Sequence, residues 1–287
     1  MVDRQVAIVT GASSGIGFEV VRGLARADFR VIAHGRSADR IREARASLTQ
    51  EFPQAAVEWF RADFSDMAQV RQAAEEIGGL TGRIDVLVNN AGQLLDSKIV
   101  TVDGFEQTFA GNVLAPFLLT SLLTPLLEKS KSPHVIQTSS AGHSYVEDMR
   151  WDDLQLEQDF DASVAYLQSK LANLILAREC ARRLAAKGIV SSAVHPGTVQ
   201  SRFTETADER TKAYFRAAAA TGDLSTPEQG ADTIIWLACR RGNALPSGGY
   251  FSERQRVEPS LAAQNPTSGP RLWKACADLL GLPGGPT

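Results

Sequence analysis

The sequence has few cysteines and no strong excess of charge of either sign. Only Cys180, Cys239 and Cys276 occur among 287 residues, an odd number without the spacing of a disulfide framework or a metal site. We therefore expect free thiols, no metal centre and a reducing, cytoplasmic location. Thirty lysines and arginines stand against 33 acidic residues, a net charge of −3. This balance gives no basic patch and predicts no nucleic-acid partner.

The sequence also lacks a clear secretory or membrane segment. Its first apolar run, at residues 6–9, is too short for a signal peptide. Residues 107–127 carry no formal charge and have the length of a membrane span. Pro116, Pro125 and several hydroxyl and amide side chains interrupt that run. We therefore expect a buried helix there, and no membrane span.

Short β-branched runs alternate with longer amphipathic segments along the chain. Strands are expected at 5–9, 30–34, 57–61, 84–89, 134–138, 189–194 and 249–251. Helices are expected at 15–27, 38–51, 67–77, 105–127 (with breaks), 163–187 and 227–238. This alternation predicts an α/β fold, a doubly wound, Rossmann-type parallel sheet flanked by helices on both faces.

The alternation of strands and helices continues without a linker to the last expected strand. It therefore predicts one domain over residues 1–253. A C-terminal extension, 254–287, follows with a different composition. Loops are expected in it at 264–270 and 281–287, with a short helix at 271–280.

A glycine-rich turn joins the first expected strand to the first expected helix. Glycines let the backbone turn sharply and let a pyrophosphate approach it, and the helix N-terminus presents N–H groups to the anion. The predicted cofactor contacts are Gly11, Ser13, Ser14, Gly15, Ile16 and Gly17. The spacing is G-x3-G-x-G and not G-x-G-x-x-G, and a tight turn without a ligand is the alternative.

The end of the second expected strand bears on which dinucleotide binds. A carboxylate there would bind the ribose hydroxyls of NAD(H), but the sequence reads His34-Gly35-Arg36-Ser37. Arg36 suits a 2′-phosphate, to which Ser13 would add a hydrogen bond. We therefore favour NADP(H) over NAD(H). The alternative is that Arg36 is only the first charged residue of a surface helix.

Tyr166 and Lys170 are four residues apart in an expected helix and share one face. A nearby ammonium lowers the pKa of a phenol, as a general acid or base requires. Such a pair is common on exposed helices, and its significance comes from residues at the ends of other strands. These are Ser139-Ser140, Asn89-Asn90-Ala91-Gly92 and Pro196-Gly197. The carboxyl ends of parallel strands form the ligand-binding edge of an open sheet.

Jointly these motifs resemble the short-chain dehydrogenase/reductase family in order and spacing, over about residues 4–252. The resemblance implies that Tyr166 exchanges a proton with the substrate and that Lys170 lowers its pKa and holds the nicotinamide ribose. It implies that Ser140, preferred to Ser139, binds the substrate oxygen. Asn112 would hold a water linking Lys170 to solvent. The further cofactor contacts that it implies are Asp63, Phe64, Asn90, Ala91, Gly92, Pro196, Gly197, Thr198 and Ser201.

The 26 positions from Ser140 to Tyr166 are about twice the family's common separation. This insertion, 142–163, contains Trp151-Asp152-Asp153-Leu154 and is similar to that of the retinol dehydrogenase-like subgroup. That subgroup favours NADP(H) and apolar carbonyl or alcohol substrates. Residues 202–220 are placed like the family's substrate lid, with a plain surface helix as the alternative. The family often pairs through its two long helices, here 105–127 and 163–187, so we expect a homodimer.

The resemblance therefore implies an enzyme, an NADP(H)-dependent oxidoreductase acting on an apolar carbonyl or alcohol. One alternative is a catalytically silent NADP(H)-binding regulatory protein, which would be expected to lack Tyr166, Lys170 or Ser140. Another is a sugar-nucleotide epimerase or dehydratase, whose usual G-x-x-G-x-x-G spacing is not found here. Two histidines near the expected site are further candidates: His195 is expected to be structural, and His143 either lies in the core or faces the pocket.

Overall fold

The computed structural model describes residues 4–199, 207–240 and 247–282. Its centre is an eight-stranded sheet in the order β3-β2-β1-β4-β5-β6-β7-β8, parallel throughout except for the pair β7 and β8. The strands are β1 (Val6–Val9), β2 (Arg30–Gly35), β3 (Val57–Arg61), β4 (Val86–Asn89), β5 (His134–Thr138), β6 (Val190–Val194), β7 (Tyr250–Ser252) and β8 (Gln255–Val257). The predicted doubly wound α/β fold is confirmed. The last strand, β8, was not predicted.

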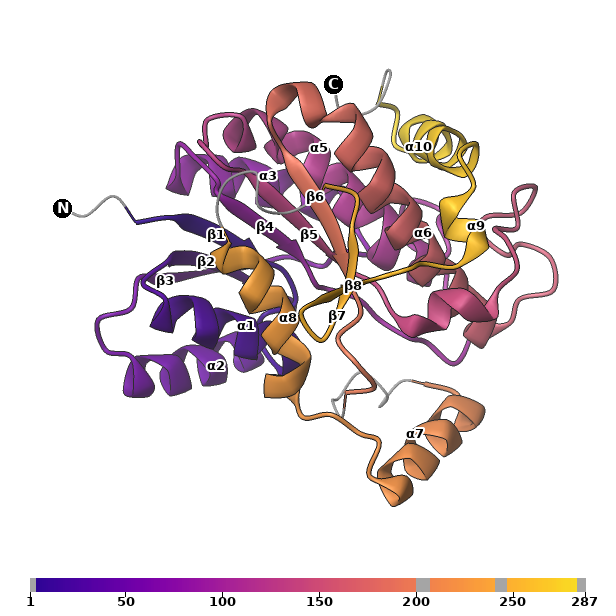
Figure 1. Ribbon diagram of the computed structural model, residues 1–287, viewed down its shortest axis with the longest axis horizontal. Helices are drawn as coiled ribbons and strands as arrows, with labels where there is room; N and C mark the ends of the chain where they lie inside the picture. Colours follow the sequence, from indigo (N-terminus) through magenta and orange to yellow (C-terminus); the bar gives the residue numbers. More distant parts are fainter. Residues whose placement is uncertain (1–3, 200–206, 241–246, 283–287) are drawn as a thin grey trace.

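Helices cover both faces of the sheet (Figure 1). Along β1, Val6 and Ile8 pack into one core and Ala7 and Val9 into the other, because successive strand residues point to opposite faces. One face carries α1 (Gly15–Arg26), α2 (Ala38–Glu51) and α8 (Pro227–Cys239). The other carries α3 (Met67–Leu80), α5 (Ala115–Leu127) and α6 (Ala162–Arg183).

Most of these helices begin where the sequence supplies a capping side chain. Ser37, Asp66 and Asp161 each accept a hydrogen bond from a backbone N–H in the first turn of α2, α3 and α6. In α8, Thr226 and Gln229 form a reciprocal capping box. The first turn of α1 lacks such a side-chain bond, which matters for the site described below.

The uncharged run 107–127 is a broken helix of the core. It consists of α4 (Gln107–Phe109), a π-helical turn (Ala110–Leu114) and α5. Among the described residues this run alone has the length and hydropathy of a membrane span. Of an 18-residue stretch within it, 78% is buried inside the protein. Such burial is typical of the predicted core helix. The π-turn places Asn112 in the interior, and such turns are frequent at functional sites.

The C-terminal extension packs against α5 and α6 (Figure 1). It contains α9 (Leu261–Gln264) and α10 (Ser268–Leu279). The prediction of a loop over 264–270 is therefore wrong at its C-terminal end, because α10 begins at Ser268 and not at Arg271. Leu272, Trp273 and Cys276 are each at most 2% exposed. This apolar stripe requires burial, and the α5–α6 layer supplies the surface that covers it.

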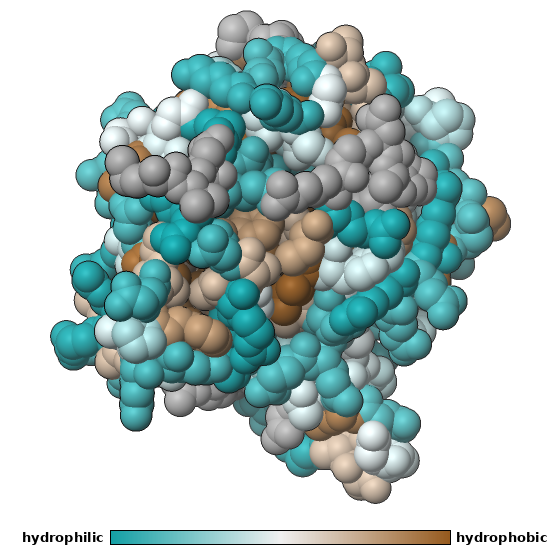
Figure 2. All heavy atoms as spheres, turned by 60° about the vertical axis from the view of Figure 1, so that its left-hand side comes forward, coloured by the Kyte–Doolittle hydropathy of each residue, from teal (hydrophilic) through white to brown (hydrophobic). Residues whose placement is uncertain are grey.

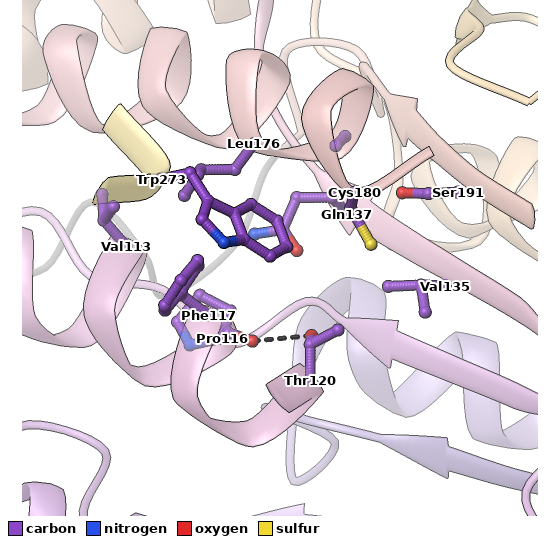
Figure 3. A pocket seen from close by; sticks show the side chains of 11 residues that line it. Val113, Pro116, Phe117, Thr120, Val135, Gln137, Leu176, Cys180, Ser191 and Trp273 are labelled. Atoms are coloured by element: carbon purple, nitrogen blue, oxygen red, sulfur yellow. Dashed lines mark hydrogen bonds between the residues drawn. The ribbon is translucent and has the colours of Figure 1, made fainter. Parts of the chain in front are cut away.

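Trp273 closes a small cavity between α5 and α6 (Figure 3). Its ring meets the edge of Phe117 on α5, with 4.9 Å between the ring centroids. The cavity has a volume of about 30 Å³, with Cys180 and Ser191 also in its lining. The extension therefore leaves only a small space beneath Trp273.

The predicted lid, 202–220, lies partly outside the described residues, which resume at 207. Its remainder forms α7 (Glu209–Thr221), none of whose residues is buried. Figure 2 shows this helix projecting below the body, with apolar side chains among hydrophilic ones. Asp208 caps α7 and also accepts a hydrogen bond from Ser163 at the start of α6. The structure thus has a surface helix here, and its action as a lid stays a prediction.

Burial of α10 makes the extension part of the stable core. We expect Trp273→Ala to lower the free energy of unfolding by about 3–5 kcal/mol, because it leaves a large cavity in a packed layer. Leu261→Ala is the matched control, since this side chain is 86% exposed. Denaturant unfolding measures both. Equal midpoints for the two variants would contradict a packed extension.

Candidate active site

The carboxyl ends of β1 and β4 are joined through Thr10. Its Oγ1 accepts hydrogen bonds from the backbone N–H groups of Asn90 and Ala91, each at 2.9 Å, and donates to Val88 O at 3.2 Å. The Asn90 side chain donates in return to Thr10 O at 2.9 Å. The glycine turn and the Asn90–Gly92 run, predicted separately as cofactor contacts, are thereby brought together. They meet where the strand order reverses, between β1 and β4.

The glycine turn is tight enough to exclude side chains. A Cβ on Gly17 would lie 2.2 Å from Gly11 O, and one on Gly11 would lie 2.8 Å from Ala91 Cα. Gly11 and Gly15 also have positive φ angles of 66° and 57°. Gly15 begins α1, and the preceding Ser14 makes no side-chain capping bond. The first N–H groups of α1 are therefore available to an anion, and the cradle fits a dinucleotide pyrophosphate.

His34 supports this turn, a role not predicted from the sequence. Its Nδ1 accepts a hydrogen bond from Gly11 N–H at 3.1 Å, so its proton is on Nε2, which donates to Ala62 O at 3.0 Å. Phe64 stacks on the ring at 4.0 Å between centroids. Burial lowers the pKa of His34 to about 4 and keeps the imidazole neutral. Nothing in the periodicity distinguishes His34 from any other residue at a strand end.

The predicted cofactor residues after β2 and β3 occupy different environments. Arg36 is exposed, and the exposed Arg61 donates from Nε to Arg36 O at 3.1 Å. Asp63 accepts hydrogen bonds from the N–H and hydroxyl of Ser65. Phe64 is only 7% exposed, so its ring contributes to the site by stacking on His34. Ser13 lies against Gly35, where a Cβ would be 3.1 Å from Ser13 Cβ.

Ser140, Tyr166 and Lys170 meet beside Gly92. The hydroxyls of Ser140 and Tyr166 share a hydrogen bond, and Lys170 Nζ lies 5.4 Å from the centre of the Tyr166 ring. Lys170 Nζ also donates to Thr138 O at 3.4 Å. A Cβ on Gly92 would be 3.5 Å from that Nζ, in van der Waals contact, so the backbone of Gly92 lies close to the Lys170 ammonium.

Desolvation sets the protonation states of this pair. Burial raises the pKa of Tyr166 to about 12, in the direction opposite to the lowering expected from Lys170, and the Ser140 hydrogen bond opposes this rise. Burial also lowers the pKa of Lys170 to about 8. At neutral pH Tyr166 is therefore a phenol that can donate a proton, and Lys170 is a cation beside it.

Asn112 reaches the same place from the π-turn. Its Oδ1 accepts from Gln93 N at 2.8 Å, and its Nδ2 donates to Gln93 O at 2.9 Å and to Ser169 Oγ at 3.0 Å. Ser169 in turn donates to Tyr166 O at 2.7 Å. Asn112 thus ties the loop after β4 to α6, and both side-chain N–H groups are used. Its predicted hold on a water stays a prediction.

The loop after β6 borders the glycine turn. Gly197 has a φ of 89°, and Thr198 O accepts from Ser225 N at 2.9 Å. A Cβ on Gly230 of α8 would lie 3.2 Å from Ile16 Cγ1 and 3.3 Å from Pro196 O, so these segments are close. Ser201 lies outside the described residues.

His143 and His195 lie around the turn that follows Ser140, and His143 is buried whereas His195 is partly buried. His195 Nδ1 accepts from Ala141 N at 3.1 Å. His143 is 3% exposed and bonds to backbone groups on both sides of its ring. The structure therefore supports the core alternative for His143. Gln93, Ser169 and Ser139, whose Oγ donates to Lys170 O at 2.8 Å, also hold the site without having been predicted to.

Comparison with known proteins agrees with this geometry. The family described as short chain dehydrogenase matches residues 5–151. Retinol dehydrogenase 11 of Mus musculus is 34% identical over 97% of this chain and 87% of its own length. The protein DnrU of Streptomyces sp. (strain C5), named provisionally as a daunorubicin C-13 ketoreductase, is 35% identical over 96% of this chain and 92% of its own.

Solved structures show the same fold. A crystal structure of a Mycobacterium Paratuberculosis protein has a TM-score of 0.77 and 29% identity, covering 97% of this chain and 94% of that one. The Pseudomonas aeruginosa RhlG/NADP active-site complex has a TM-score of 0.68 and 28% identity, covering 86% of this chain and 93% of that one.

Burial of the Lys170 charge predicts a pH-dependent effect on stability. Folding lowers its pKa from 10.5 to about 8, so the buried charge costs stability below pH 8, and the cost vanishes above about pH 10.5. We expect Lys170→Met to raise the free energy of unfolding at pH 7 by roughly 1–3 kcal/mol and to lose this advantage by pH 10.5. Denaturant unfolding at both pH values measures it. Lys129→Met, at an exposed position, is the control, and a less stable Lys170→Met at pH 7 would contradict the prediction.

Proposed function

The chain belongs to the short-chain dehydrogenase/reductase family, and we propose that it is an NADP(H)-dependent oxidoreductase acting on an apolar carbonyl or alcohol. Family membership carries the coarser statement, the NAD(P)-dependent interconversion of a carbonyl and an alcohol. The single observation that carries the proposal is the Tyr166 hydroxyl, hydrogen-bonded to Ser140 and adjacent to the Lys170 cation. A catalytically silent protein has no need to keep these three groups together.

The chain's own residues supply binding and proton transfer. Ser140 donates a hydrogen bond to the substrate carbonyl oxygen, which polarises the carbonyl. Tyr166, a phenol at neutral pH, passes its proton to that oxygen as the alcohol forms, and the Lys170 cation stabilises the tyrosinate left behind. The bound dinucleotide supplies the hydride. In the reverse direction the tyrosinate takes the alcohol proton.

Two guanidinium groups support the choice of NADP(H). Arg36 and Arg61 are exposed beside each other at the ends of β2 and β3. Neither forms an ion pair within the described residues, and no carboxylate stands in the His34–Ser37 segment. Both charges are therefore available to a 2′-phosphate, which a guanidinium binds in a bidentate manner. A structural relative is also titled as an NADP complex.

An apolar substrate is supported by the relatives and by the surroundings of Ser140. The names of two relatives refer to retinol, a long apolar alcohol, and to the C-13 ketone of daunorubicin. Tyr145, at the end of the turn that Ser140 begins, is 74% exposed and offers an aromatic surface there. An NADPH-consumption screen over retinal, an aliphatic aldehyde, an aliphatic ketone, a steroid ketone and a quinone tests this proposal.

The cellular location and assembly also remain proposals. Cys180 and Cys276 are buried thiols that form no disulfide within the described residues, which supports a reducing, cytoplasmic compartment. The homodimer expected from the resemblance would use α5 and α6. In this chain α9 and α10 already pack against α6. A homodimer through these helices would therefore have to form around the extension.

Removing the proton donor tests the proposed chemistry. We expect Tyr166→Phe to lower kcat by at least about a hundredfold, because the phenyl ring keeps the packing but has no proton to transfer. Fluorescence titration should show nearly unchanged NADPH binding. Turnover at the wild-type rate would exclude Tyr166 as the acid. NADPH binding by a wild-type protein that reduces no compound of the screen would favour the regulatory alternative.

Removing the guanidinium groups tests the choice of cofactor. We expect Arg36→Ala to raise KM for NADPH about tenfold or more and to leave KM for NADH nearly unchanged, because only NADPH carries the 2′-phosphate. Arg61→Ala should act in the same direction. Arg42→Ala is the control, since this exposed side chain of α2 pairs with Asp39. Equal weakening of NADPH and NADH would refute the 2′-phosphate contact.

A further inference from the structure

The hydroxyl assigned to the substrate oxygen begins a very short structural element. Ser140 caps a single 3-10 turn, Ala141–Tyr145, and its Oγ accepts a hydrogen bond from Gly142 N at 3.1 Å. One turn of 3-10 helix makes few hydrogen bonds of its own. The orientation of Ser140 therefore depends on what holds this turn from outside.

His143 supplies one such contact, in a single protonation state. Its Nε2 accepts a hydrogen bond from the Ser260 backbone N–H at 3.1 Å. A backbone nitrogen can only donate, so the proton of the neutral imidazole is on Nδ1, which donates to Ser140 O at 2.7 Å. Burial lowers the pKa of His143, which favours this neutral form. The ring edge also packs against Tyr250, 5.1 Å away between centroids.

The group on the other side of the imidazole belongs to the C-terminal extension. Ser260 lies between β8 and α9, and α10 anchors this part of the chain through Trp273 and its neighbours. Within the described part of the chain the buried Ser260 hydroxyl has no hydrogen-bond partner, so the backbone N–H is the group that ties this residue to the site. Two hydrogen bonds, from Ser260 N–H to His143 and from His143 to Ser140 O, thus join the packed extension to the carbonyl of Ser140.

We propose that His143 is a positioning residue, which fixes the orientation of Ser140 by joining its carbonyl to the N–H of Ser260. The C-terminal extension is thereby part of the catalytic apparatus without touching the substrate. The proposal rests on the proposed function, because it assigns Ser140 to the substrate oxygen. It differs from a role of His143 in proton transfer, since both ring nitrogens are engaged with backbone groups.

Ser260 offers a matched pair of variants, one without and one with the N–H that binds His143. Ser260→Pro replaces the N–H by a ring carbon that would meet Nε2 and so breaks the contact with His143, and the φ of −59° at this position is one that proline adopts. Ser260→Ala keeps the N–H and removes only the unpartnered hydroxyl. With the compound of the screen that is reduced fastest, we expect Ser260→Pro to lower kcat several-fold to about tenfold, and Ser260→Ala to match the wild type. KM for NADPH should stay within about twofold in both, because the cofactor cradle is not touched.

Variants of His143 separate its two contacts. His143→Leu loses both, and we expect a fall in kcat of about tenfold or more with KM for NADPH unchanged. His143→Asn places an amide N–H near the position of Nδ1, so it should keep the bond to Ser140 and recover part of kcat. His134→Leu is the control. This histidine is also buried, but it lies at the amino end of β5, whereas the site lies at the carboxyl ends of the strands.

Tyr166→Phe is measured in parallel to separate the two proposals. If Tyr166→Phe is inactive while Ser260→Pro and His143→Leu keep the wild-type kcat, the positioning role is wrong and the proposed function stands. If Tyr166→Phe is fully active, the proposed function itself fails. A rise in KM for NADPH equal to the fall in kcat, or the same losses in His134→Leu, would show a general structural defect and would overturn the positioning role.

Discussion

The hydrogen bonds of Thr10 hold the ends of β1 and β4 together, and the rest of the site depends on that junction. The connections of these two strands lead to helices on opposite faces, so a crevice opens between them. The glycine turn forms one wall and the Asn90–Gly92 run the other. Because a Cβ on Gly11 would meet Ala91, the close approach of these walls requires glycine. Gly92, at the end of the second wall, lies close to Lys170.

Desolvation gives the polar groups around this crevice their chemical states. It keeps His34 neutral, so that one ring nitrogen can accept from the glycine turn, and it keeps Tyr166 protonated. It also makes the charge of Lys170 costly. A protein selected for stability alone would not bury an ammonium here. The role that we propose for Lys170 accounts for this cost.

The sequence predicts the parts of the structure that short-range patterns determine. Apolar runs such as Val6–Val9, bounded by turn residues, gave the strands, and capping residues such as Ser37 and Asp66 mark where helices begin. The glycine spacing and the Tyr166–Lys170 pair located the crevice, while individual roles came from the family resemblance. Of the predicted site residues, only Ser201 lies outside the described part of the chain.

Contacts between distant segments could not be predicted in this way. His34 supports the glycine turn because β2 lies beside β1, and no local pattern reveals which backbone group its ring will meet. The same holds for His143 and Ser260, which are 117 residues apart. The start of α10 was misplaced because Pro270 and its polar neighbours have the composition of a loop. Proline is tolerated in the first turn of a helix, and the buried stripe that follows stabilises that turn.

The packing of α10 on the α5–α6 layer has a consequence for how this protein responds to dilution. When a separate subunit covers an apolar layer, the cover is lost as the protein concentration falls below the dissociation constant. Here the cover is attached to the same chain, so its local concentration is fixed. The support of Ser140 through Ser260 and His143 is then equally complete in dilute and in concentrated solution.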